Sequence, residues 1–236
     1  MVLNYIILNG KSSTYVQGLL IQSLPPITKP QMRTEIDVIN GRDGDIVTPL
    51  GYSAYDKSIS VGLHGDYNID DVIRFFDSEG IVTFSNEPYK YYKYTMIDQI
   101  DFERLAMFRT ATVTFHVQPF KWSLVEPTRF FVIYEGMTFV QIRNNGNALS
   151  KPKITVYGDG NVSLKLNGTQ AFSIDFTNHE EVTIDVDAME ASYNGQLMNR
   201  IVSGDYENFM LKQGINTITW TGDLWEIDFD SYSRWI

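Results

Sequence analysis

The chain has 236 residues, of which 29 are Asp or Glu and 19 are Lys or Arg, so its formal net charge is −10; it contains no cysteine. Such an acidic chain argues against a protein that binds nucleic acid by neutralising phosphates, and the lack of cysteine excludes disulfides, thiolate metal sites and a cysteine nucleophile. Aromatic residues make up 14% of the chain, which favours strands over helices. The length predicts one large domain or two small ones.

The start of the sequence carries no recognisable targeting signal. Residues 1–10 lack a basic beginning, and their apolar stretch at 5–8 is much shorter than the core of a secretion signal. No apolar run in the sequence approaches the roughly 20 residues that span a bilayer. We therefore expect neither secretion nor membrane insertion.

One helix and four strands are predicted in the first half of the chain. Asn68 can cap the helix, Asp70 and Asp71 suit the positive end of its dipole, and Gly80 can end it. The strands are predicted at residues 57–63, 81–85, 91–99 and 110–118. Apolar and polar residues alternate through the last strand, as in a half-buried strand. The last two strands are long enough to form an extended hairpin over residues 91–118.

The pattern is interrupted at Glu126-Pro127, and a fresh series of short strands follows. Apolar residues again recur with a period of two, in runs that begin about ten residues apart, and Asn167-Gly168 and Asn194-Gly195 mark tight turns. This spacing is typical of a β-sandwich or barrel. We predict a mainly β chain with two domains: residues 1–127 form a mixed β-sheet or sandwich with one short helix, and residues 128–236 form a β-sandwich.

Signals for chemistry are weak throughout the sequence. The three histidines, His64, His116 and His179, lie in separate predicted elements without a second ligand at metal-binding spacing. The sequence has no Gly-x-Ser-x-Gly elbow. The loop Gly158-Asp159-Gly160 is followed by a strand pattern rather than by a phosphate-binding helix. We expect no catalytic residue, no metal and no cofactor.

A cluster of tyrosines indicates an interface instead. Tyr89, Tyr91, Tyr92 and Tyr94 alternate both ways along one predicted strand, so some of the rings must be exposed or buried against another chain. Tyr is enriched at protein interfaces. His116 lies on the outward side of its strand. We interpret the cluster as an inter-subunit surface, with a glycan-binding surface as the alternative.

Several short segments resemble one known family. Residues 38–44, Val-Ile-Asn-Gly-Arg-Asp-Gly, look like a turn in the amino-terminal domain of the distal tail (Dit) proteins of long-tailed phages that infect Gram-positive bacteria. There, Gly41 and Gly44 permit a tight reversal, and Arg42 and Asp43 can pair across it. Further segments resemble that family's carboxy-terminal domain, in the same order: residues 145–148, 151–158, 204–206, 214–220 and 232–235.

The resemblance implies a structural role in a phage or prophage virion. It implies a homo-hexameric ring at the distal end of a non-contractile siphovirus tail, synthesised in the host cytoplasm, with amino-terminal domains forming a belt around a DNA channel and carboxy-terminal galectin-like sandwiches outside. The implied partners are the tail tube protein, the tail-associated tip protein (Tal) and receptor-binding or baseplate proteins. The ring contacts that we predict within it are Arg42, Asp43, Tyr91, Tyr92, Tyr94 and His116.

Two other classes of protein remain open at this point. A stand-alone carbohydrate-binding β-sandwich would need an exposed aromatic platform. A glycoside hydrolase would need paired carboxylates, for which Asp175 and Glu181 on neighbouring predicted strands are the candidates.

Overall fold

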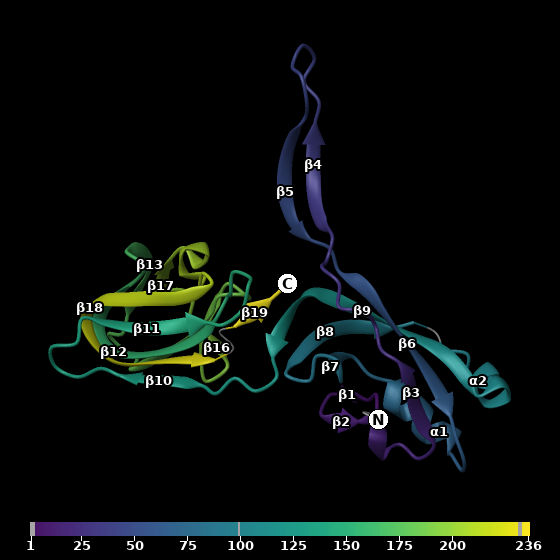
Figure 1. The fold of residues 1–236 in the computed structure, drawn as a ribbon. Helices are drawn as coiled ribbons and strands as arrows, with labels where there is room; N and C mark the ends of the chain where they lie inside the picture. The colour runs from purple at the N-terminus through teal and green to yellow at the C-terminus, as the bar shows by residue number, and fades with distance from the viewer. Residues whose placement is uncertain (1–2, 99, 231–232) are drawn as a thin grey trace. The chain divides into compact units, whose positions relative to one another are not determined.

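The computed structural model describes residues 3–98, 100–230 and 233–236. The chain divides into two compact units, Met1–Leu124 with Ile236, and Val125–Trp235. Both consist mainly of β-strands (Figure 1), which confirms the fold class predicted from the sequence. Neither of the two α-helices in the described part of the chain has the length and apolar character needed to cross a bilayer.

The first unit is built on one curved sheet. Its strands follow the order β2-β1-β7-β8-β9-β6-β3, and every pairing along this path is antiparallel. The sheet includes all four strands that the sequence predicts in this half. The bounds are β1 (Ile6–Leu8), β2 (Lys11–Ser12), β3 (Leu19–Ser23), β6 (Tyr55–Leu63), β7 (Gly80–Phe84), β8 (Lys90–Ile97) and β9 (Thr110–Ser123).

The predicted helix is α1 (Ile69–Phe76). A single-turn 3-10 helix, Ser13–Tyr15, lies much earlier in the chain, between β2 and β3. The Asn68 side chain accepts a hydrogen bond from the Asp70 backbone N–H at 3.0 Å, as an N-cap does. The helix buries Val72, Phe75 and Phe76. Gly80 does not end it, contrary to the prediction: the cap is Asp77, and Gly80 begins β7 with φ +134°.

A second helix, α2 (Phe102–Phe108), lies between β8 and β9 and was not predicted. The two strands pair with each other, but they are joined through this helix rather than by a tight turn. Leu105 is fully buried in the core of the unit. The predicted extended hairpin over residues 91–118 is therefore corrected to a strand, a helix and a strand.

Two further strands of the first unit lie outside this sheet and pair only with each other. β4 (Met32–Asp37) and β5 (Ile46–Tyr52) form a separate two-stranded ribbon (Figure 1). The turn between them contains the Asn40–Asp45 segment, and Gly41 and Gly44 have φ values of +85° and +75°. The predicted reversal is therefore present. We call residues 31–52 the arm.

The second unit is organised around two long strands. The bounds are β10 (Arg129–Val132), β11 (Phe139–Asn144), β12 (Lys153–Leu166), β13 (Thr169–Asp175), β14 (Glu181–Asp185), β15 (Glu190–Tyr193), β16 (Gln196–Leu197), β17 (Val202–Gly204), β18 (Gly214–Asp230) and β19 (Arg234–Trp235), with a 3-10 turn at Tyr206–Phe209. β12 and β18 pair along most of their length. The first half of β12 also pairs with β14 and its second half with β13.

The core of this unit follows the predicted alternation. Ile154, Val156, Val162 and Leu164 all point into it from β12. The β12–β18 register shifts between Tyr157 and Gly158, where a Cβ on Gly158 would collide with the Asp223 carbonyl. A bulge of this kind bends both strands, so that each can contribute to a closed core.

Candidate functional site

The arm exposes a series of apolar side chains. All six residues of β4 and five of the seven in β5 are exposed. A lone two-stranded ribbon is marginally stable in water, and exposed apolar patches mark protein contacts. The exposed apolar residues between the two strand ends are Met32, Ile36, Val38, Ile39, Val47 and Leu50. These features make the arm the main candidate for contact with another protein.

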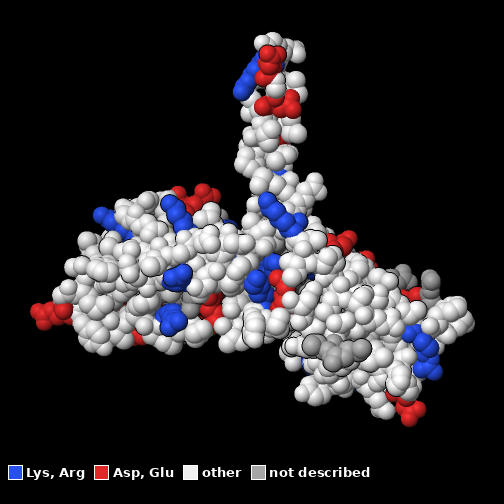
Figure 2. Space-filling view, viewed as in Figure 1, with Lys and Arg blue, Asp and Glu red and all other residues white. Residues whose placement is uncertain are grey.

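The tip of the arm carries charges of both signs. Figure 2 shows basic and acidic side chains gathered at its far end. Arg42, Asp43 and Asp45 are all exposed there. No ion pair joins Arg42 to Asp43 within the described residues, so the expected pairing across the turn is not observed. Both charges face solvent at a position where a partner can reach them.

The base of the arm is closed by local contacts. The Ser53 backbone N–H donates to the Gln31 carbonyl at 2.9 Å. The Tyr52 ring packs edge-on against Phe120 with 5.7 Å between centroids, and the Lys29 ammonium lies 6.0 Å from the Tyr52 centroid. The base of the arm thus contacts β9, an inner strand of the first unit's sheet.

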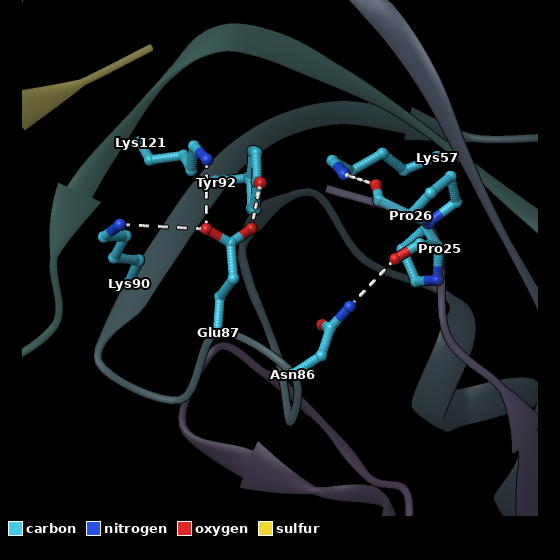
Figure 3. Close-up of polar contacts among 8 residues, drawn as sticks. All are labelled: Pro25, Pro26, Lys57, Asn86, Glu87, Lys90, Tyr92 and Lys121. Atoms are coloured by element: carbon cyan, nitrogen blue, oxygen red, sulfur yellow. Dashed lines mark hydrogen bonds and ion pairs between the residues drawn. The ribbon is translucent and has the colours of Figure 1, made fainter. Parts of the chain in front are cut away.

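The segment that leads into the arm is held from inside the core (Figure 3). The Pro26 carbonyl accepts a hydrogen bond from Lys57 Nζ at 2.8 Å, and the Pro25 carbonyl accepts one from Asn86 Nδ2 at 2.9 Å. Lys57 is only 3% exposed. A buried ammonium must find acceptors, so this bond fixes both the lysine and the chain entering the arm.

The buried carboxylate of Glu87 lies among the lysines near the start of the arm. Glu87 accepts from the Tyr92 hydroxyl at 2.5 Å and from Lys121 Nζ at 3.0 Å, while Lys90 Nζ lies 3.8 Å away (Figure 3). Lys57 Nζ lies 4.9 Å from the centroid of the Tyr92 ring. We call Lys57, Glu87, Tyr92 and Lys121 the buried anchor.

The pKa values of the anchor follow from these contacts. Burial lowers the pKa of Lys57 to about 8; nearby Glu87 opposes the change and Lys121 adds to it. Burial alone would raise the pKa of Glu87, but the hydrogen bonds from Tyr92 and Lys121 outweigh it, so that pKa lies below its usual value. Burial and the Glu87 charge raise the pKa of Tyr92. Glu87 therefore stays ionised near neutral pH, and its charge opposes the lowering of the Lys57 pKa by burial.

The structure separates the predicted tyrosines into two groups. Tyr91 is half-buried, and its ring stacks on Trp122 with 5.9 Å between centroids. Tyr92 is fully buried and Tyr94 is 3% exposed, with the Tyr94 hydroxyl 2.7 Å from Ser78 Oγ. This corrects the prediction for Tyr92 and Tyr94: they are core residues, because the face of β8 that they share with Val82 and Phe115 is the inner face.

The remaining predicted contact residues lie at the surface. Arg42 and Asp43 are at the arm's tip, and His116 lies on β9, where its Nδ1 is 2.7 Å from Asp56 Oδ1 on β6. The structure does not bring these residues together into one site. Their part in subunit contacts stays a prediction.

No catalytic arrangement is found among the residues described. No group of three or more His, Asp or Glu side chains could hold a metal ion. Asp175 and Glu181, the hydrolase candidates, lie on β13 and β14, which pair with different halves of β12 rather than with each other. Hydrogen bonds from Thr177 lower the pKa of Asp175, whereas a general acid needs a raised pKa. This geometry does not suit glycoside hydrolysis.

Comparison with known proteins identifies the fold. No family model and no curated protein matches the sequence. Among solved structures, the chain has the fold of phage tail hub proteins. The particular match is the Dit protein (gp 19.1) of SPP1, described as a paradigm of the hub adsorption apparatus in phages that infect Gram-positive hosts. The two sequences are 17% identical, and the structures superimpose with a TM-score of 0.67 over 100% of each chain.

Two weaker matches come from the phage P2 baseplate in its activated conformation. The calcium form gives a TM-score of 0.46 at 12% identity, covering 100% of this chain and 99% of that one. The strontium form gives 0.42 at 11%, covering 98% and 99%.

Proposed function

We propose that this chain is a structural distal tail protein and not an enzyme. Six copies form a ring at the tip of a long non-contractile phage tail. The ring connects the tail tube protein to the tail-associated tip protein and to the receptor-binding or baseplate apparatus, and leaves a channel for DNA. The observation that carries the proposal is the match to the SPP1 Dit fold over the whole of both chains at a TM-score of 0.67.

Within this proposal, residues 1–127 form the belt and residues 128–236 form the outer sandwich. The arm supports the belt assignment, because its exposed apolar residues suit contact with another copy of the chain. A closed ring with head-to-tail interfaces offers this contact, since each subunit presents the same surface to the next. Arg42, Asp43, Tyr91 and His116 are the surface residues that we assign to ring contacts.

Light scattering combined with negative-stain imaging of the purified chain tests the ring. The expected result is a particle with six times the mass of the chain and a central hole. Ile36 and Val47 lie directly opposite each other on the arm, so the double variant Ile36→Lys, Val47→Lys is expected to shift the particle to monomers. Ile215 and Leu197 are exposed apolar residues of the second unit, and replacing both by Lys serves as the matched control.

Antibody labelling of virions tests the location. An antibody raised against the chain is expected to label one end of the tail, distal to the capsid. Label along the tube or on the capsid would contradict a distal hub. Specific binding to glycans by a chain that contacts no tail protein would favour the carbohydrate-binding alternative instead.

A further inference from the structure

The outward face of the second unit's sheet carries a compact group of carboxylates. Glu226, Asp228 and Asp230 alternate with the core residues of β18 and therefore point to the opposite face. On the neighbouring strand β12, Thr155 lies opposite Asp228 and Tyr157 lies opposite Glu226. One strand further, Glu181 on β14 lies opposite Tyr157. We call Glu181, Glu226, Asp228 and Asp230 the acidic face.

Asp228 is the unusual member of this group. It is only 9% exposed, and its Oδ1 atom is buried without a hydrogen-bond partner within the described residues. Buried carboxylate oxygens in proteins are nearly always hydrogen-bonded, because leaving one without a donor is costly. The fold thus holds at the centre of the face an acceptor that lacks a donor.

Further negative charges surround Asp228. Burial, the charge of Glu226 and a hydrogen bond shared with it, and the charges of Asp230 and Glu181 together raise the pKa of Asp228 to about 6. Burial and the same carboxylates raise the pKa of Tyr157. Lys153 lies opposite Asp230 and Asp185, one row away from Asp228, and the Thr128 hydroxyl donates to Asp230 at 2.6 Å. The face therefore has more negative charge than its own groups neutralise.

The spacing of the carboxylates does not suit a metal ion. Side chains on one face of a strand repeat about every 6.6–6.8 Å, and neighbouring strands lie about 4.8 Å apart. Calcium needs six to eight oxygens at about 2.3–2.6 Å. A flat sheet cannot bring these carboxylates to such distances from one point, and no metal-binding group is found among the described residues.

An extended segment with cationic side chains fits the same spacing. Basic residues at alternate positions of a strand repeat with the period of Glu226, Asp228 and Asp230. Phe130, directly opposite Asp228 on β10, is 65% exposed, and Val132 beside it is also exposed. A guanidinium can stack on an aromatic ring while its forked N–H groups donate to carboxylates.

We propose that the acidic face binds an arginine-bearing segment of another protein, with a guanidinium donating to Asp228 and its neighbours while it packs on Phe130. The segment belongs to a different protein rather than to a second copy, since no two arginines of this chain stand at alternate positions of the sequence. The inference rests on the second unit alone and does not depend on the proposed tail function.

A labelled peptide, acetyl-Gly-Arg-Gly-Arg-Gly-Arg-Gly-amide, titrated into the full chain at low salt and pH 7.5 tests the proposal. Saturable binding is expected. The double variant Glu226→Gln, Asp228→Asn is expected to weaken it by about tenfold or more, because partnered interface charges are lost. The control Asp66→Asn, Glu79→Gln removes the same charge from two exposed positions of the first unit and is expected to change binding less than about twofold.

A second measurement on the unmodified chain does not depend on variants folding. The carboxyl carbon of Asp228, followed by NMR through a pH titration, is expected to shift its midpoint downward when the peptide saturates the face, because a nearby cation favours the ionised form. An unchanged midpoint, equal weakening by both double variants, or absence of saturable binding would overturn the proposal. Calcium that shifts the midpoint where the peptide does not would also overturn it.

Discussion

Individual side chains in the buried anchor illustrate how context decides the role of a residue. In the sequence, Lys57, Glu87 and Lys121 are ordinary charged residues next to strand patterns. In the fold they meet inside the first unit, where Glu87 contacts Lys121 and the Tyr92 hydroxyl. Buried charges tolerate little change, because removing one partner leaves the other charge uncompensated.

The substitution Glu87→Gln keeps the size of the side chain and removes its charge. We expect it to lower the free energy of unfolding of the first unit by about 3–5 kcal/mol, since Lys121 and Lys57 lose their balancing acid. Hydrogen exchange in peptides of β6 and β9 measures this within the unit concerned. The control is Arg74→Gln at the exposed Arg74–Asp71 pair, where we expect less than about 1 kcal/mol. Equal effects of the two substitutions would show that the anchor is not a stabilising unit.

The burial of Asp228 lowers the stability of the folded chain by an amount that depends on pH. Its unfolded carboxyl ionises near pH 4, whereas in the folded chain it keeps its proton until about pH 6. The folded state therefore holds an extra proton between these values, so stability falls as the pH rises from 4 to 6, and the full loss is present above pH 6.

The substitution Asp228→Asn removes this loss. We expect it to stabilise the second unit by about 1–2 kcal/mol at pH 7.5, below the limit set by 1.36 kcal/mol per pKa unit, and to have no effect near pH 4. Urea unfolding followed by tryptophan fluorescence at the two pH values measures the difference. Asp223→Asn, at an exposed position on the same strand, is the control. A gain of the same size at both pH values would contradict the electrostatic cause.

At the scale of elements, local signals predicted more than long-range ones. α1 was predictable because its cap, its acidic first turn and its apolar residues all lie within nine positions of the sequence. α2 was not predicted, although Asp101 directly before it is a residue type that caps helices, because the helix is only seven residues long and its helical state accompanies packing of Leu105 into the core. Propensity is a weak guide where tertiary contacts decide.

Register explains a second group of differences. Trp225 shares sequence parity with the core residues Ile227 and Phe229, yet it is exposed because the β12–β18 register shifts near Leu224, which is buried instead. A bulge reverses the faces of the residues beyond it. The tyrosine cluster shows the same limit: alternation identified two faces, but it could not indicate which of them was the inner one.

The attachment of the arm is tested by one lysine. Lys57→Met removes the bond to the Pro26 carbonyl while keeping a long apolar side chain. We expect faster amide exchange at the arm's base, about tenfold or more at Ser53, because a hydrogen bond to a charged group contributes about 1.5–3 kcal/mol. Lys11→Met, at an exposed position on β2 of the same unit, is the matched control. Unchanged exchange at Ser53 would show that the arm is held by its own strand pairing alone.

At the scale of the whole molecule, the candidate binding surfaces are separate from the two apolar cores. Each unit has its own apolar core, and the exposed arm, the charges at its tip and the acidic face all lie outside these cores. A scaffold of this kind places binding surfaces on a rigid frame. The fold match extends over the full length of the SPP1 protein although only 17% of residues are identical, as expected when packing pattern and turns are retained while surfaces vary.

Removing the arm separates folding from assembly. Met32 and Tyr52 lie opposite each other at its base, so replacing residues 33–51 by two glycines can close the chain with a short turn. We expect the first unit to keep its thermal unfolding temperature within a few degrees, because no arm residue belongs to its core. We expect the same variant to lose the six-copy particle in light scattering, because the apolar contact between copies is gone. A shortened chain that still forms rings would assign the ring contacts to the sheet and not to the arm, and a shortened chain that fails to fold would show that the arm contributes to the core after all.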